Sequence, residues 1–164
     1  NITPWILDTL KSYQAKATFF CVGENIVRHP EIFQRIKEEG HSIGNHTMQH
    51  NTGSKTQNDV YIKSIMACQQ YTQTNLFRPP HGLIKPSQIQ PLKQFFRIIM
   101  WSNLTYDFDK NISPEACFQN AIKNLKPGSI IVFHDNIKAE KNMRYALPLF
   151  LEFLQKNNLK AIGI

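Results

Sequence analysis

The sequence has 164 residues, of which 41% are hydrophobic and 19% are charged. A chain of this length and composition can bury a substantial core, so disorder and a coiled coil are excluded and a single domain over residues 1–164 is expected. The net charge of +7 comes from 19 Lys and Arg against 12 Asp and Glu. These basic residues are scattered, with no arginine cluster among aromatics, so a solvated basic surface is favoured and nucleic acid is not an expected partner.

Strands and helices alternate along the chain, beginning with a helix that Thr3 is expected to cap and that has Pro4 at its first position. Strands are predicted at residues 17–22, 41–45, 76–78, 97–101, 129–134 and 159–164. Further helices are predicted at residues 30–39, 58–72, 87–96, from Ser113 onward, and at 141–156 with an interruption near Pro148. This alternation indicates an α/β fold with parallel strands and crossover helices. Because such units normally open with a strand, a first strand is expected to be missing.

No apolar run reaches the length of a bilayer span, and the N-terminus lacks the charged and apolar regions of a signal peptide. A membrane span is therefore not expected. The three cysteines, Cys21, Cys68 and Cys117, lie far apart without a CxxC motif. This pattern indicates neither a zinc knuckle nor a disulfide framework.

Polar residues that could take part in catalysis or metal binding repeatedly follow the predicted strands. In order, these are His46 and His50, then Arg78, then Asp107 and Asp109, and finally His134 with Asp135. The carboxyl ends of barrel strands and the loops after them carry the chemistry of α/β barrels, so these residues are expected at one rim. This repeated placement after strands is stronger evidence for a functional site than any single motif.

His46 and His50 stand four residues apart, a spacing that lets two imidazoles reach one metal ion from a single turn of chain. A pair of surface histidines that caps a turn would show the same spacing. The other motifs of the chain therefore decide the interpretation.

Together the segments resemble the NodB-type polysaccharide deacetylases, carbohydrate esterase family four, whose fold is a distorted seven-stranded barrel. His46-Thr47-x-x-His50 matches the family's second motif, and Arg78-Pro79-Pro80-His81-Gly82 matches its third. The fourth motif is matched loosely by Trp101-Ser102 with Asp107-Phe108, and the fifth by the apolar strand that ends in His134-Asp135. Residues 17–23 also resemble the family's second strand.

The family's first motif, Thr-Phe-Asp-Asp-Gly-Pro, has no match, and no Asp-Asp pair occurs in the sequence. That motif lies on the first strand of the family, directly before the helix that opens this chain. The missing strand and the missing motif therefore coincide. The chain is expected to be an N-terminally incomplete deacetylase domain.

The resemblance implies that His46 and His50 bind a divalent metal, with zinc as the expected ion, while an upstream aspartate is a further ligand. It implies that His134 is the general acid that protonates the departing amine, and that Asp107 holds His134 in one tautomer. Asp109 is the rival of Asp107 for this role, and either could be a loop residue that binds its own backbone.

The resemblance also implies that Arg78 pairs with and orients the missing catalytic base. Pro79 and Pro80 would fix the loop so that the backbone amide of His81 faces the oxyanion, while the role of the His81 side chain is open. Trp101 would line the acetyl pocket, although a strand tryptophan is more often plain core.

The function implied is removal of N-acetyl groups from a hexosamine-containing glycan such as peptidoglycan or a chitin-like polymer. An O-acetyl esterase, for instance on xylan, and an inactive glycan-binding barrel are the alternatives. A basic nucleic-acid binder would reveal itself by salt-sensitive binding to DNA. The expected partner is an acetylated glycan, the expected state is a monomer, and the family implies a cell-envelope or extracellular location.

Overall fold

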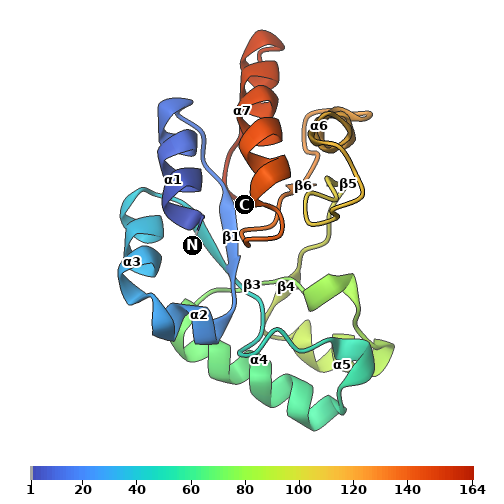
Figure 1. Cartoon of the computed structure of the whole chain (residues 1–164). Helices are drawn as coiled ribbons and strands as arrows, with labels where there is room; N and C mark the ends of the chain where they lie inside the picture. Colours follow the sequence, from blue (N-terminus) through green and yellow to red (C-terminus); the bar gives the residue numbers. More distant parts are fainter. Residues whose placement is uncertain (1) are drawn as a thin grey trace. The chain divides into compact units, whose positions relative to one another are not determined.

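The computed structural model describes residues 2–164, and they divide into two compact units. One unit runs from Thr18 to Met100 and includes Ile164. The other contains the residues up to Ala17 and those from Trp101 to Gly163. Figure 1 labels the helices and strands of both.

The unit from Thr18 to Met100 is built on a parallel four-stranded sheet with the order β1-β2-β3-β4. Its strands are β1 (Thr18–Cys21), β2 (Ser42–Asn45), β3 (Leu76–Phe77) and β4 (Arg97–Ile98). The crossovers contain α2 (Gly23–Arg28), α3 (Pro30–Glu38), η1 (Gly53–Lys55), α4 (Asn58–Thr72), η2 (Pro80–Gly82) and α5 (Pro86–Leu92). Parallel strands joined by helical crossovers confirm the predicted α/β class.

The register of this sheet brings the ends of its strands to one edge. Asn45, the last residue of β2, pairs with Cys21 of β1 and with Phe77 of β3. Two further backbone bonds continue the pattern, because the N–H of His46 donates to the Cys21 carbonyl and that of Arg78 donates to the Asn45 carbonyl, each at 3.0 Å. His46 and Arg78 therefore leave the sheet at the same edge.

An aromatic and aliphatic cluster fills the space between this sheet and α4 and α5. Its buried members are Tyr61, Ile65, Phe77, Leu92 and Phe96, with Ile84 and Ile98 packed against them. The apolar positions of α4 and the inward side chain of β3 meet here. Burial of this cluster fixes the end of β3, from which Arg78 emerges.

The second unit contains a shorter parallel pair of strands. Its elements are α1 (Thr3–Ser12), β5 (Asn103–Leu104), α6 (Pro114–Ile122), β6 (Ile131–Val132) and α7 (Glu140–Lys156). In the register of this pair, Asn103 lies opposite Ile131 and Leu104 opposite Val132. The residues that follow the two strands, up to Asp107 and His134, therefore also come out at one edge. Ser113 caps α6 as predicted, since its Oγ accepts from the Ala116 N–H at 3.1 Å.

Several element predictions were wrong. Thr3 is the first residue of α1 and not its cap, and its hydroxyl donates to Asp135 at 2.6 Å. Helix α7 is continuous through Pro148, because six apolar residues on one face of it are buried and outweigh the one missing backbone donor. Residues 159–164 form no strand, and the sequence reading missed α2 and β5.

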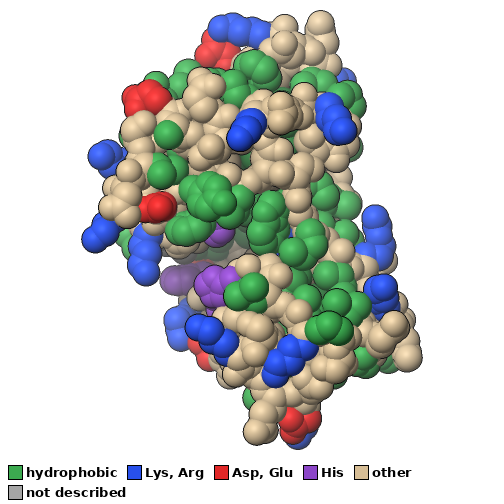
Figure 2. Space-filling model, turned by 90° about the vertical axis from the view of Figure 1, so that its right-hand side faces the viewer, with side chains coloured by type: hydrophobic (Ala, Val, Ile, Leu, Met, Phe, Trp, Pro, Cys, Tyr) green, Lys and Arg blue, Asp and Glu red, His purple; other side chains and the backbone are tan. Residues whose placement is uncertain are grey.

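None of the helices within residues 2–164 combines the length and apolar character needed to cross a bilayer. Figure 2 shows lysine and arginine side chains scattered over the face in view, with histidine side chains also exposed on it. Closure of a barrel and a missing first strand stay predictions.

Candidate functional site

His46 and His50 lie side by side at the end of β2. Their ring centroids are 4.9 Å apart and the rings are inclined by 64°. His46 is half-buried and follows the strand directly, whereas His50 is exposed in the loop after it. The four-residue spacing therefore brings the two imidazoles close together, as the binding of one metal ion by both would require.

A backbone hydrogen bond fixes the tautomer of His46. Its Nδ1 lies 2.6 Å from the carbonyl oxygen of Arg78. Since a carbonyl can only accept, Nδ1 carries the proton and the lone pair of the neutral ring is on Nε2. Histidines that bind metals typically donate their other ring N–H to a carbonyl or carboxylate in this way. The residues present thus fit a divalent metal, although no group of three or more such ligands is already assembled within residues 2–164.

The backbone between the two histidines is strained and held firmly. Thr47 has φ 66° and His50 has φ 58°, and a left-handed conformation is a true outlier for a β-branched residue such as Thr47. The buried Asn45 side chain accepts from the Thr47 N–H at 3.0 Å and donates to the Ile65 carbonyl at 2.9 Å. Strain that neighbouring bonds enforce is typical of functional loops.

Arg78 is anchored at the edge where β3 ends. Its Nε donates to the Ile99 carbonyl at 3.1 Å and an Nη donates to the Met100 carbonyl at 3.2 Å. The guanidinium also lies 4.1 Å from the centre of the Phe20 ring. Burial lowers the pKa of Arg78 to about 10, so the side chain remains a cation at neutral pH. It is a rigid positive charge beside the histidine pair.

The loop after Arg78 turns sharply through Pro80–Gly82. His81 has φ 58° and Gly82 has φ 70°, and the Gly82 N–H donates to the Pro79 carbonyl at 2.9 Å. The N–H of His81 has no acceptor within residues 2–164. The His81 ring meets that of His50 edge to face, with the centroids 4.8 Å apart.

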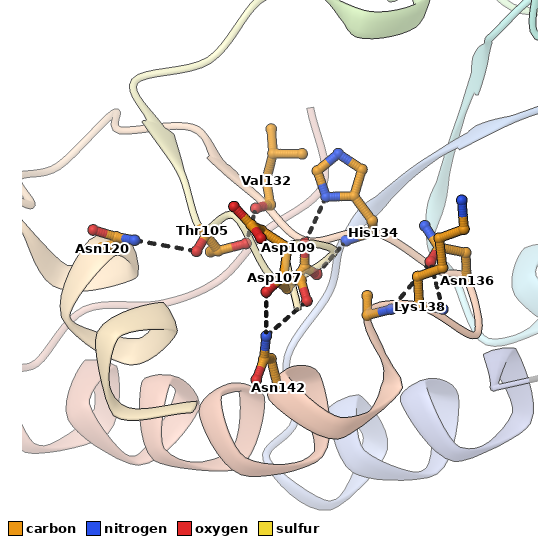
Figure 3. A network of polar contacts seen from close by, with 10 residues as sticks. Thr105, Asp107, Asp109, Asn120, Val132, His134, Asn136, Lys138 and Asn142 are labelled. Atoms are coloured by element: carbon orange, nitrogen blue, oxygen red, sulfur yellow. Dashed lines mark hydrogen bonds and ion pairs between the residues drawn. The ribbon is translucent and has the colours of Figure 1, made fainter. Parts of the chain in front are cut away.

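In the second unit, Asp107 and His134 form a close pair (Figure 3). One carboxylate oxygen of Asp107 lies 2.6 Å from His134 Nδ1, and the other accepts from the backbone N–H of His134, also at 2.6 Å. Asp107 is fully buried, whereas His134 is partly exposed. The two bonds fix the orientation of the ring and leave Nε2 for chemistry at the surface.

Asp109, the alternative partner of His134, is engaged elsewhere. Its Oδ1 accepts from the N–H of Asn111 at 2.9 Å and closes a local turn. The ring between the two aspartates, Phe108, packs edge to face on His134 with centroids 4.7 Å apart. Phe108 also lines a hollow of about 570 Å³ together with Asp109, Lys110, Asn111 and Lys138.

Sequence reasoning missed Asn142, which supports this pair from α7 (Figure 3). Its buried Nδ2 donates to the backbone carbonyls of Asp107 at 2.9 Å and Asp109 at 3.3 Å. The signal in the sequence is an asparagine at an inward position of α7, beside Met143 and one turn before Ala146. A polar residue on a buried helix face needs a partner, and here the partner is the loop that carries Asp107.

The Asn142→Asp variant should lower the free energy of unfolding by about 1–3 kcal/mol. The substitution keeps the shape of the side chain but places carboxylate oxygens against two carbonyl oxygens, which can only accept. Urea unfolding followed by circular dichroism measures the change. Asn25→Asp, at an exposed position of α2, is the matched control and should stay within about 0.5 kcal/mol of the parent. Equal stability of the two variants would contradict the supporting role of Asn142.

The two buried cysteines, Cys68 and Cys117, are not suited to act as nucleophiles. All three are free thiols. Burial, and secondarily the nearby Asp107 carboxylate, raise the pKa of the Cys117 thiol to about 12. Burial also raises the pKa of Cys68. Neither thiol is therefore a nucleophile at neutral pH.

The predicted residues thus fall into two groups. His46, His50, Arg78, Pro80 and His81 belong to the unit of β1–β4. Of these, His46, His50, Arg78 and His81 meet through backbone and ring contacts at one sheet edge or directly beside it. Asp107 and His134 form the second group, in the unit that also contains the half-buried Trp101.

Comparison with known proteins identifies the class. The family model for polysaccharide deacetylases matches residues 1–95, more than half of the chain, so the chain belongs to the polysaccharide deacetylase family. The matched segment includes the histidine pair and the Arg78 loop.

Individual relatives carry related names. A peptidoglycan-N-acetylglucosamine deacetylase of Bacillus cereus is 39% identical over 141 residues, which are 82% of this chain and 51% of that protein. Chitin deacetylase 2 of Saccharomyces cerevisiae is 33% identical over 160 residues, 90% of this chain and 50% of that protein. The chain therefore spans about half the length of these relatives.

One solved structure has a closely similar fold. The crystal structure of the Bc1960 peptidoglycan N-acetylglucosamine deacetylase, in complex with a hydroxamate-type benzamide, matches with a TM-score of 0.93 and 33% identity. The match covers 100% of this chain and 80% of that one. This likeness supports the α/β fold with parallel strands on which both groups of residues are placed.

Proposed function

We propose that the protein is an amide hydrolase that removes N-acetyl groups from a hexosamine-containing glycan. The observation that carries the proposal is the His46–His50 pair, in which the Arg78 carbonyl fixes the His46 tautomer at 2.6 Å. A buried carboxylate that orients a partly exposed histidine, Asp107 with His134, supplies the proton-transfer group that such a reaction needs.

His46 and His50 would hold a divalent metal, with zinc as the proposed ion. When bound, the metal supplies Lewis-acid polarisation of the acetamide carbonyl and activation of water. The family resemblance assigns a further carboxylate ligand and the catalytic base to an Asp-Asp motif, which these 164 residues do not contain. The histidine pair is thus proposed as part of a larger ligand set.

His134 would protonate the departing amine through Nε2. Its Nδ1 proton is held by Asp107, so the ring has one orientation and the positive charge it gains is stabilised by the buried carboxylate. Proton delivery makes the amine a viable leaving group, which amide hydrolysis requires because a neutral amine departs and an amide anion does not.

Arg78, Pro80 and His81 would have further roles in the same reaction. Arg78 is proposed to pair with the base carboxylate, which its cationic state at neutral pH permits. The unused N–H of His81, fixed by the turn at Pro80, is suited to stabilise an oxyanion. Trp101 is proposed to line the acetyl pocket.

The relatives' names favour an N-acetylated glycan, peptidoglycan or chitin, as the substrate. An acetylated glycan at the cell envelope or outside the cell is the proposed partner, with the protein acting as a monomer and the described residues as one deacetylase domain.

Acetate release by the full-length protein tests this function on three substrates, namely peptidoglycan, N-acetylglucosamine oligomers and acetylated xylan. Release from either of the first two, and its loss in His134→Ala, is the expected result. Release from xylan alone would identify an O-acetyl esterase. Glycan binding without any release would identify an inactive binding module.

A further inference from the structure

The hollow beside Phe108 lies next to the histidine that is proposed to donate a proton. It has a volume of about 570 Å³, and all its lining residues belong to the unit that contains residues 101–163. Phe108 connects it to the site, because the same ring packs edge to face on His134 with centroids 4.7 Å apart. Small-molecule sites have volumes of about 300–1,000 Å³. A ligand in this hollow would therefore be separated from His134 by a single aromatic ring.

Hydrogen bonds hold the chain segments that line the hollow in place. In the first segment, the N–H of Asp109 donates to the Tyr106 carbonyl at 2.9 Å, and Asp109 Oδ1 accepts from the Asn111 N–H at 2.9 Å. In the second, the Asn136 side chain accepts from the N–H of Lys138 at 2.9 Å (Figure 3). A site whose backbone is already fixed loses little conformational entropy when a ligand binds.

The lining of the hollow carries a net positive charge. Lys110 and Lys138 both line it, against the single carboxylate of Asp109. Neither lysine forms an ion pair with a carboxylate within residues 2–164. In the same unit, by contrast, Lys156 is paired with Glu152 at 2.6 Å. Two unpaired ammonium groups beside an aromatic ring favour a ligand that combines an anionic group with an apolar face.

We propose that this hollow binds a carboxylate-bearing sugar next to the reacting hexosamine, and that Lys110 and Lys138 pair with its carboxylate. The 38% exposed ring of Phe108 offers an apolar surface to the sugar, while the side chains of Asp109 and Asn111 are suited to its hydroxyl groups. The proposal rests on the proposed function and narrows its substrate to an anionic glycan. A neutral chitin-like polymer lacks the group with which the lysines pair.

The test compares two tetrasaccharides in which N-acetylglucosamine alternates with N-acetylmuramic acid. One keeps the free lactyl carboxylates, and in the other each carboxylate is converted to a neutral amide. The full-length protein should release acetate from the acid form with a kcat/KM about 3–30-fold higher, as expected of two ion pairs at an exposed site. The difference should lie in KM, because the carboxylate does not react. An ionic strength of about 1 M should largely remove it, since charges are then screened beyond about 3 Å.

The double variant Lys110→Gln, Lys138→Gln should lose this preference for the acid form. Its matched control is the double variant Lys11→Gln, Lys160→Gln, which replaces two exposed lysines of the same unit that do not line the hollow. Both variants lower the net charge of the protein equally. The control should keep the preference of the parent, so a loss confined to the first variant reports the hollow and not the overall charge.

Equal kcat/KM for the two tetrasaccharides on the unaltered protein would overturn the inference and leave the proposed function standing. A preference that persists in Lys110→Gln, Lys138→Gln would also overturn it, because the carboxylate would then be recognised elsewhere. Calorimetric binding of both tetrasaccharides measures recognition without catalysis. If neither releases acetate, the proposed function is wrong, and the inference stands only if the acid form binds more tightly and this variant abolishes the difference.

Discussion

Replacing Asp107 by alanine should lower kcat for deacetylation by about 10²–10⁴-fold. The buried carboxylate accepts two bonds of 2.6 Å, one from the backbone N–H of His134 and one from its ring. Without it, the imidazole can rotate and adopt the other tautomer, and the positive charge of the acid form loses its partner. Initial rates of acetate release from N-acetylglucosamine oligomers measure the effect.

Stability should fall in the same variant, because the substitution leaves the partly buried backbone N–H of His134 without its acceptor. The expected loss is about 1–3 kcal/mol in the free energy of unfolding, and kcat must therefore be measured on protein shown to be folded at the assay temperature. Asp59→Ala, at an exposed position of α4, is the control and should change neither quantity appreciably. Asp109→Ala should lose much less activity than Asp107→Ala. A larger loss in Asp109→Ala than in Asp107→Ala would show that Asp109, and not Asp107, is the functional partner of His134.

The sheet edge at which His46 and Arg78 meet could be predicted from the sequence, and the reason is geometric. Consecutive parallel strands end at the same edge, so residues that directly follow two buried runs become neighbours. The backbone hydrogen bonds from His46 to Cys21 and from Arg78 to Asn45 show this geometry. Helix α4 was also predicted with its observed bounds, although its buried face includes Ser64 and Thr72 beside Tyr61, Ile65 and Cys68.

The contacts between loops could not be predicted in the same way. The choice between Asp107 and Asp109 depends on which carboxylate the turn at Asn111 engages, and both lie in one short segment. The meeting of His81 with His50 depends on two left-handed residues that no periodicity encodes. Local hydrogen bonds decide such details, and they act only after the sheet has placed the loops.

The predicted length of the strand at residues 129–134 was wrong for a related reason. The apolar run at residues 129–134 predicts a full strand, but only Ile131–Val132 form a ladder. His134 lies two residues beyond the end of this short strand. The backbone N–H of His134 bonds to the Asp107 side chain and not to a neighbouring strand, so the strand does not continue through it.

Removal of divalent metal by a chelator should lower the rate of acetate release by at least about 10³-fold, and added Zn²⁺ or Co²⁺ should restore the rate. A metal that binds only the folded protein should also raise the free energy of unfolding by about 2.7 kcal/mol at a concentration 100 times its Kd. His50→Ala should lose both responses, since it removes one of the two imidazoles proposed to hold the metal. Urea unfolding with and without Zn²⁺ measures the second response independently of catalysis.

His29→Ala is the control for both readouts, because it removes one exposed imidazole and leaves the edge of the β1–β4 sheet intact. It should retain rescue by metal and the full stabilisation. Weak binding of Zn²⁺ by histidines of the unfolded chain would reduce the stabilisation of every variant alike, so the difference between His50→Ala and His29→Ala is the decisive quantity. Stabilisation by Zn²⁺ that is the same in both variants would place the metal elsewhere than at the His46–His50 pair.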